Sequence, residues 1–188
     1  VIRRPKPDDY QIKEAAELIK KSKKPLIISG GGAFYSDATD ELSSFATKHN
    51  IPVTQTVMGY STMKKDHSHY LGAIGGLGGR AANNLSKETD MAIAIGTKLA
   101  DFTTGSWANF ENPDFKLVSI NAGRFDANKH MAQAIVGDAK VSLMELSQAL
   151  GNWKADDDWY KKSRIELKNW EFYVDKESGP TNQKLPSY

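Results

Sequence analysis

The sequence predicts an α/β domain built around a mainly parallel sheet. Short apolar runs alternate with segments whose apolar residues recur at helical spacing, and several of the runs end at glycine. Parallel strands need crossover connections about as long as these helical segments. We therefore predict a doubly wound, Rossmann-like fold in which helices cover both faces of a six-stranded sheet.

The first third of the chain predicts a helix, a strand and a second helix. After Pro7 and Asp8, one helical face carries Ile12, Ala15, Ala16 and Ile19. The apolar run at 25–28 is typical of a buried parallel strand, and it leads into a glycine turn at 30–32. Ser36 and Asp37 are expected to cap the second helix, whose buried face carries Leu42, Phe45, Ala46 and His49.

The same alternation continues to residue 150. Further strands are predicted at 51–57, 91–95, 116–120 and 134–136, and further helices at 81–85 and 139–150. The glycine-rich stretch 72–79 opens the helix at 81–85, and we interpret the segment before Gly76 as a polar loop.

A charged helix is predicted at 156–174, leaving the α/β body. It carries Trp159, Trp170 and Tyr173. These aromatic side chains either belong to the core of this domain or pack on a neighbouring domain. The remaining residues are expected to form a tail.

Composition narrows the class of protein. The 188 residues carry a formal net charge of +2 with both signs scattered, which argues against a nucleic-acid-binding surface. There is no cysteine and no apolar run long enough to cross a membrane, so we expect a cytoplasmic protein without disulfides or thiolate metal sites.

The basic, proline-containing start lacks an initiator Met. We therefore expect an excised piece: a linker at 1–9, a central domain at 10–151, and a helix and linker at 152–188.

Two glycine loops are candidate phosphate-binding turns. Residues 30–32 lie between a strand and a helix, but Tyr35 replaces the last glycine of a GxGxxG motif. Residues 76–81 fit GxGxxA without a clear preceding strand. Both loops are expected to line one crevice at the carboxyl ends of the strands. The alternative is that the glycines only permit tight turns.

Other polar residues give weaker indications. His67 and His69 suggest a metal site only if further ligands lie nearby. Lys98, Asp101 and Thr103 follow a predicted strand, where ligands or neighbouring domains are often met. No nucleophile, base and orienting group form a recognisable triad, so no catalytic residue is assigned.

The order of the segments resembles the middle domain of thiamine-diphosphate enzymes, such as acetolactate synthase, pyruvate oxidase and glyoxylate carboligase. The matching stretches are KPLIISGGG at 24–32, the segment 66–78 with LGAIG at 71–75, IGTK at 95–98 and IVGD at 135–138. Within this group, AFYS at 33–36, GTKLADFTTGS at 96–106 and SIN at 119–121 are most similar to the ring-opening hydrolases of myo-inositol breakdown.

The resemblance implies a larger, homo-oligomeric enzyme. An N-terminal domain would supply the activating Glu, and a C-terminal domain would bind Mg²⁺ and the diphosphate of thiamine diphosphate. Residues 184–188 look like the beginning of that second domain. The middle domain would orient its neighbours, and alone it would be inactive.

In flavin-dependent relatives, the same loops hold FAD. The matching positions here are Gly31, Gly32, Gly75, Gly76 and Lys98. Lys98 stands where those relatives usually have Arg, and Asn121 stands where they commonly have an acidic residue, so we expect no FAD. Two alternatives remain: an FAD-binding middle domain of acetolactate synthase or carboligase type, and a stand-alone regulatory nucleotide-binding module.

Overall fold

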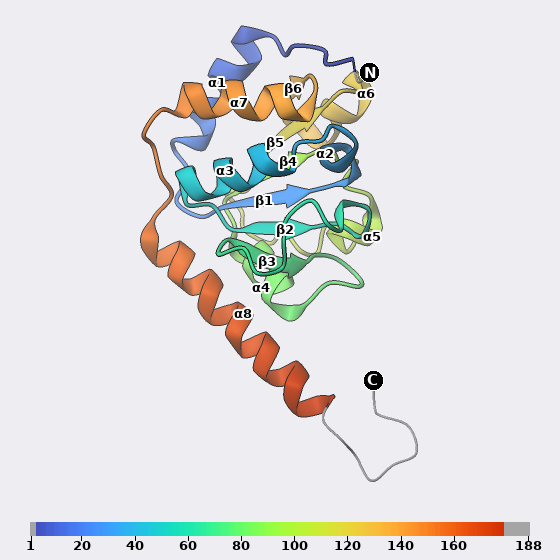
Figure 1. Cartoon of the computed structure of the whole chain (residues 1–188), viewed down its shortest axis with the longest axis vertical. Helices are drawn as coiled ribbons and strands as arrows, with labels where there is room; N and C mark the ends of the chain where they lie inside the picture. The colour runs from blue at the N-terminus through green and yellow to red at the C-terminus, as the bar shows by residue number, and fades with distance from the viewer. Residues whose placement is uncertain (1–2, 179–188) are drawn as a thin grey trace.

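The computed structural model describes residues 3–178 and contains a six-stranded, all-parallel sheet (Figure 1). The strands are β1 (Pro25–Ser29), β2 (Val53–Gln55), β3 (Tyr70–Ala73), β4 (Met91–Ile95), β5 (Lys116–Asn121) and β6 (Gln133–Val136), in the order β3-β2-β1-β4-β5-β6. This order is that of a doubly wound sheet whose direction reverses between β1 and β4. The predicted fold class is confirmed.

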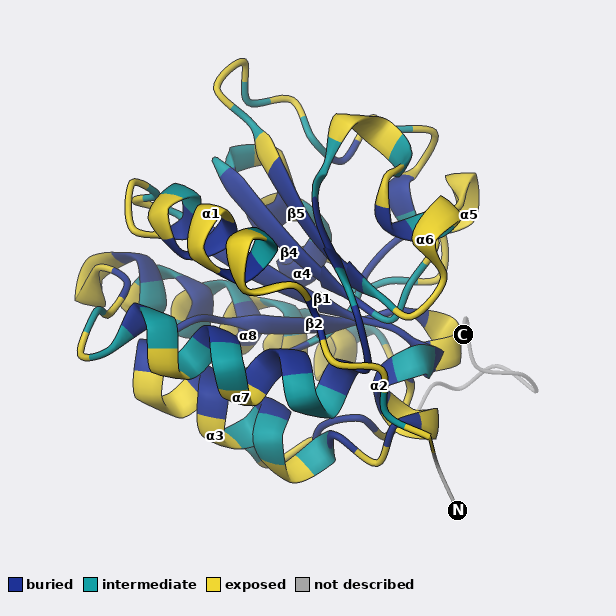
Figure 2. Cartoon of the chain, turned by 90° about the horizontal axis from the view of Figure 1, so that it is seen from above, coloured by how far each residue is buried: buried dark blue, intermediate teal, exposed yellow. Residues whose placement is uncertain are grey.

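Helices cover both faces of the sheet (Figure 2). The elements are α1 (Asp9–Ile19), α2 (Gly31–Tyr35), α3 (Thr39–His49), α4 (Arg80–Glu88), α5 (Asp101–Thr104), α6 (Arg124–Ala127), α7 (Ala139–Leu150) and α8 (Asp157–Glu177), with short 3₁₀ turns η1 (Val57–Gly59) and η2 (Lys129–Met131). One core cluster joins the sheet to α1, α3 and α7, and the other joins it to α4 and α8. None of the helices in the described range is long and apolar enough to span a membrane.

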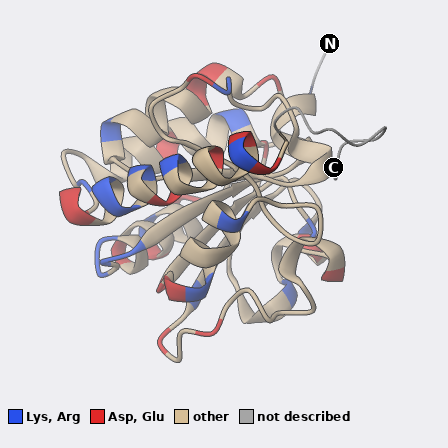
Figure 3. Cartoon of the chain, turned by 90° about the horizontal axis from the view of Figure 1, so that it is seen from below, with Lys and Arg blue, Asp and Glu red and all other residues tan. Residues whose placement is uncertain are grey.

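Local sequence explains the best-defined elements. Asp8 caps α1 by accepting hydrogen bonds from the amides of Tyr10 and Gln11, and the predicted apolar face of that helix is buried. β1 and β4 are apolar along almost their whole length because every residue in them is buried. Charged residues of both signs are distributed over the helices (Figure 3).

The β2–β3 region differs from the prediction. The expected strand at 51–57 is reduced to Val53–Gln55, because Thr56 accepts a hydrogen bond from the amide of Gly59 and turns the chain into η1. The segment interpreted as a polar loop contains β3, the one strand of the six-stranded sheet that the sequence did not locate. β3 is a short edge strand, interrupted by Gly72 at φ +97°, so its sequence lacks a continuous apolar run.

The predicted caps of the second helix are wrong. α2 occupies residues 31–35 and ends at Ser36, whereas α3 begins at Thr39 after Ala38. Asp37 adopts φ +52° in the turn between the two helices. The side chain of Ser36 instead hydrogen-bonds to Asp138.

The last helix packs on the body rather than leaving it. α8 contacts α4 and β3, and Trp159, only 4% exposed, donates from Nε1 to the carbonyl of Pro25 at 2.8 Å. Trp170 is partly buried against the same core cluster. Trp159 therefore belongs to the core of this domain. The tail predicted at 175–188 begins too early, because residues 175–177 still belong to α8, and residues 179–188 lie outside the described part of the chain.

Candidate functional site

The candidate site is a crevice at the carboxyl ends of β1, β2 and β4. A cavity of about 470 Å³ opens there, and Gly31, Gly32 and Lys98 are among its lining residues. A second cavity, of about 370 Å³, lies toward β5 and β6 and shares Gly32 and Lys98 with the first. The sequence thus predicted three residues that the fold brings together at the reversal point of the strand order.

Close backbone packing accounts for the first glycine turn. The amide of Gly30 donates to the carbonyl of Ile95 at 2.8 Å, and the amide of Gly32 donates to the carbonyl of Gly96 at 2.9 Å. A Cβ on Gly32 would lie 2.7 Å from the Cα of Gly96. Because these two amides already bond to carbonyls at the end of β4, they are not available to a diphosphate as free donors.

The second glycine loop lies behind Phe102 and does not line either cavity. Gly76 donates its amide hydrogen to the carbonyl of Phe102 at 2.9 Å. A Cβ on Gly75, which has φ +97°, would lie 2.3 Å from the same oxygen. Gly75 and Gly76 therefore hold the α5 turn, whose residues Phe102 and Thr103 face the crevice.

Lys98 is an exposed cation beside a carboxylate. Asp126 lines the second cavity together with Lys98. A 2.7 Å hydrogen bond from Lys129 lowers the pKa of Asp126; burial opposes this, and the positive charges of Lys129 and Lys98 reinforce it. The anionic Asp126 weakens the attraction that Lys98 would exert on a phosphate.

A buried hydrogen-bond network closes the end of the second cavity. Asp138 accepts hydrogen bonds from Ser36, Arg4 and the amide of Val141. Burial raises the pKa of Asp138, but these three hydrogen bonds and the charge of Arg4 outweigh it and leave the pKa lowered. Sequence reasoning missed this network, although an Asp directly before a helix signals its capping role.

The remaining candidates have structural partners. Asn121 accepts a hydrogen bond from the amide of Gly123 within the turn after β5. His69 is buried between Ser68, Asn50 and the ring of Tyr160. No group of three or more His, Cys, Asp or Glu side chains that could hold a metal ion occurs within residues 3–178. Asp101 begins α5, and Thr103 of that helix lines the crevice.

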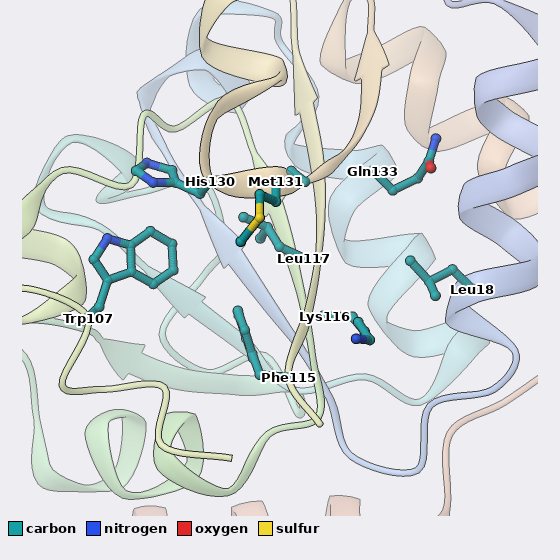
Figure 4. A pocket seen from close by; sticks show the side chains of 9 residues that line it. Leu18, Trp107, Phe115, Lys116, Leu117, His130, Met131 and Gln133 are labelled. Carbon is teal, nitrogen blue, oxygen red and sulfur yellow. The ribbon is translucent and has the colours of Figure 1, made fainter. Parts of the chain in front are cut away.

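A larger cavity, of about 640 Å³, lies at the opposite edge, where β5 and β6 begin (Figure 4). Trp107, Phe115 and Met131 line it, and the ring of His130 lies 4.5 Å from that of Trp107. None of the predicted site residues lies in it.

Comparison with known proteins identifies the family. Residues 12–146 match the family described as thiamine pyrophosphate enzyme, central domain. The chain belongs to this family. The match covers the sheet from α1 to α7, including the crevice.

Three curated relatives of this chain carry the same enzyme name. The chain is 42% identical over 149 residues to a 3D-(3,5/4)-trihydroxycyclohexane-1,2-dione hydrolase of Clostridium perfringens, covering 79% of this chain. A protein with the same name from Clostridium tetani is 39% identical over 170 residues, which cover 90% of this chain. Another from Bacillus licheniformis is 43% identical over 153 residues, which cover 81% of this chain. The chain spans only 23%, 26% and 24% of the three relatives. Their polypeptides therefore include other domains.

Proposed function

We propose that this chain is the non-catalytic middle domain of a thiamine-diphosphate-dependent hydrolase. The complete enzyme would open the ring of a cyclic 1,2-dione by C–C bond cleavage in myo-inositol degradation. The observation that carries this proposal is 39–43% identity to hydrolases of that name, together with the family match.

The proposed division of the chain has a linker at 1–9, a central domain at 10–151, and a helix and linker at 152–188. Gly151, with φ +62°, ends α7 and supports the second boundary. Because α8 packs on α4, the connecting role is assigned to the residues after this helix.

Thiamine diphosphate and Mg²⁺ would be bound by the neighbouring domains. The described part of this chain does not fit either group. It has no cluster of metal ligands, and the two buried or half-buried carboxylates beside the crevice, Asp126 and Asp138, are paired with Lys129 and Arg4. Gly31, Gly32 and Lys98 in the crevice, with Gly75 and Gly76 packed behind Phe102, remain our candidates for a nucleotide-binding crevice, occupied or vestigial.

The alternative of an FAD-binding domain is not favoured. The amide of Gly32 donates to Gly96, Asp126 lies beside Lys98, and Gly75 and Gly76 are packed behind Phe102. The amides of Gly32 and Gly76 are therefore occupied by backbone carbonyls, which weakens the case for a diphosphate cradle in this crevice. We further propose that the parent enzyme is a cytoplasmic homo-oligomer.

The proposal is tested by the substrate range of the full-length polypeptide that contains this chain. With thiamine diphosphate and Mg²⁺, we expect hydrolysis of the cyclic trihydroxy-dione, detected as consumption of the dione and release of acid. Pyruvate should yield no acetolactate. Acetolactate formation without dione hydrolysis would overturn the proposal and favour the synthase alternative.

A further inference from the structure

Exposed apolar side chains gather at the carboxyl edge of the sheet. Fourteen large apolar residues in the described range are exposed, and eight of them follow the carboxyl ends of strands. Five of these lie at the crevice and are called here the carboxyl-edge patch: Phe34, Tyr35, Val57, Met58 and Phe102. A soluble surface rarely keeps so many apolar side chains together without a partner.

The carboxyl-edge patch is one continuous surface. Tyr35, Val57, Met58 and Phe102 line the same cavity of about 470 Å³. The ring of Phe34 lies 5.8 Å from that of Tyr35, and α2 contacts η1. The patch therefore joins three separate connections of the chain into a single apolar rim around the crevice.

Both ends of the described chain reach this same edge. Near the N-terminus, Arg4 hydrogen-bonds to Ser36 and Asp138, which follow β1 and β6. Near the C-terminus, Trp170 lies against Gly79, and the Arg80 guanidinium lies 4.1 Å from the ring centroid of Tyr173, at the α4 end that follows β3. Figure 1 shows the strands pointing toward the side where α2, α5 and α6 lie and where α8 ends.

We propose that the carboxyl-edge patch is covered by the remainder of the same polypeptide, so that the crevice is a chamber between domains. This inference rests on the proposed function. About three quarters of each relative lies outside the region matched by this chain, and the chain would continue from both ends at the apolar edge. A neighbour tethered there meets the patch at high effective concentration.

Methionine oxidation provides matched probes of this burial. Met58 in the patch is 70% exposed, whereas Met131, near the opposite edge, is 100% exposed and Met144 on α7 is 59% exposed. In the 188-residue chain, peroxide should oxidise all three readily. In the full-length polypeptide, oxidation of Met58 should slow about tenfold relative to Met131 and Met144, because sulfoxide formation follows exposure. Mass spectrometry of the peptides measures each rate.

Three outcomes would overturn the inference. Met58 oxidation that is equally fast in both polypeptides would mean that the patch stays exposed. Equal slowing of the oxidation of all three methionines in the full-length polypeptide would be a general effect and would not indicate burial of the patch. Protection of Met58 in the 188-residue chain that increases with protein concentration would assign the patch to a second copy.

A pair of variants gives a second readout. In the 188-residue chain, Met58→Glu and Met144→Glu should leave the melting temperature unchanged, because both side chains are exposed. In the full-length polypeptide, Met58→Glu should lower it and Met144→Glu should not. Equal effects of the two substitutions there would contradict the inference. Neither readout uses dione hydrolysis, so a protected Met58 in an enzyme with another substrate would overturn only the proposed function.

Discussion

The hydroxyl of Ser36 donates a hydrogen bond to the carboxylate of Asp138, 102 residues further along the chain. This contact joins the end of α2 to the N-terminal cap of α7. Ser36→Ala should lower the free energy of unfolding by about 1–2 kcal/mol, because a buried acceptor loses one donor. Urea unfolding measures the change. Ser44→Ala, at an exposed position on α3, should change it by less than about 0.5 kcal/mol; equal losses would contradict the assigned role of Ser36.

Stability should fall in mild acid because of His69. Burial, followed by the charges of His67 and Arg164, lowers the pKa of His69 from 6.5 to about 4. Below pH 6.5 the unfolded chain binds a proton that the folded chain refuses, so stability is lost as pH falls from about 6.5 to about 4. The full loss is about 3 kcal/mol at 1.36 kcal/mol per pKa unit.

Denaturant unfolding at a series of pH values measures this dependence. His69→Gln should flatten the curve between pH 6.5 and 4. An unaltered pH dependence in His69→Gln would show that other groups cause the loss.

The glycine turn after β1 should be intolerant of a side chain. A Cβ on Gly32 would collide with the backbone of Gly96, and we expect Gly32→Ala to lower stability by about 2–3 kcal/mol. Gly72 has φ +97° with open space around it, so Gly72→Ala should show only the smaller backbone penalty, about 1 kcal/mol. Thermal unfolding of the two variants compares these effects, and a larger loss at Gly72 would contradict the packing argument.

The elements that the sequence predicted well are those whose burial leaves a local pattern. β1 and β4 are buried at every residue, so their apolar runs identify them directly. β3 is a half-buried edge strand containing Gly72, and nothing in its four residues distinguishes it from a loop. Likewise, Gly31, Gly32 and Lys98 meet because carboxyl ends of parallel strands share one edge. The placement of Phe102 in front of Gly75 and Gly76 depends on tertiary packing, which spacing cannot reveal.

The C-terminal half of α8 should depend on Trp170. Its ring lies over Gly79 and stacks on the ring of Tyr173, with the two centroids 5.6 Å apart. The Arg80 guanidinium lies 5.9 Å and 4.1 Å from the centroids of Trp170 and Tyr173. Trp170→Ala removes these contacts and should increase amide hydrogen exchange in the last turns of α8. Phe172→Ala, at a position 73% exposed, is the control. Similar exchange in both variants would mean that Trp170 does not hold the helix.

The most direct measurement of where the catalytic centre lies is a calorimetric titration of thiamine diphosphate, with Mg²⁺ present, into the 188-residue chain and into the full-length polypeptide. We predict saturable heat only for the full-length polypeptide, because the described residues of this chain contain no metal-ligand cluster and the amides of Gly30 and Gly32 in its first glycine turn are already paired. Saturable binding by the 188-residue chain alone, with similar affinity, would contradict a non-catalytic middle domain.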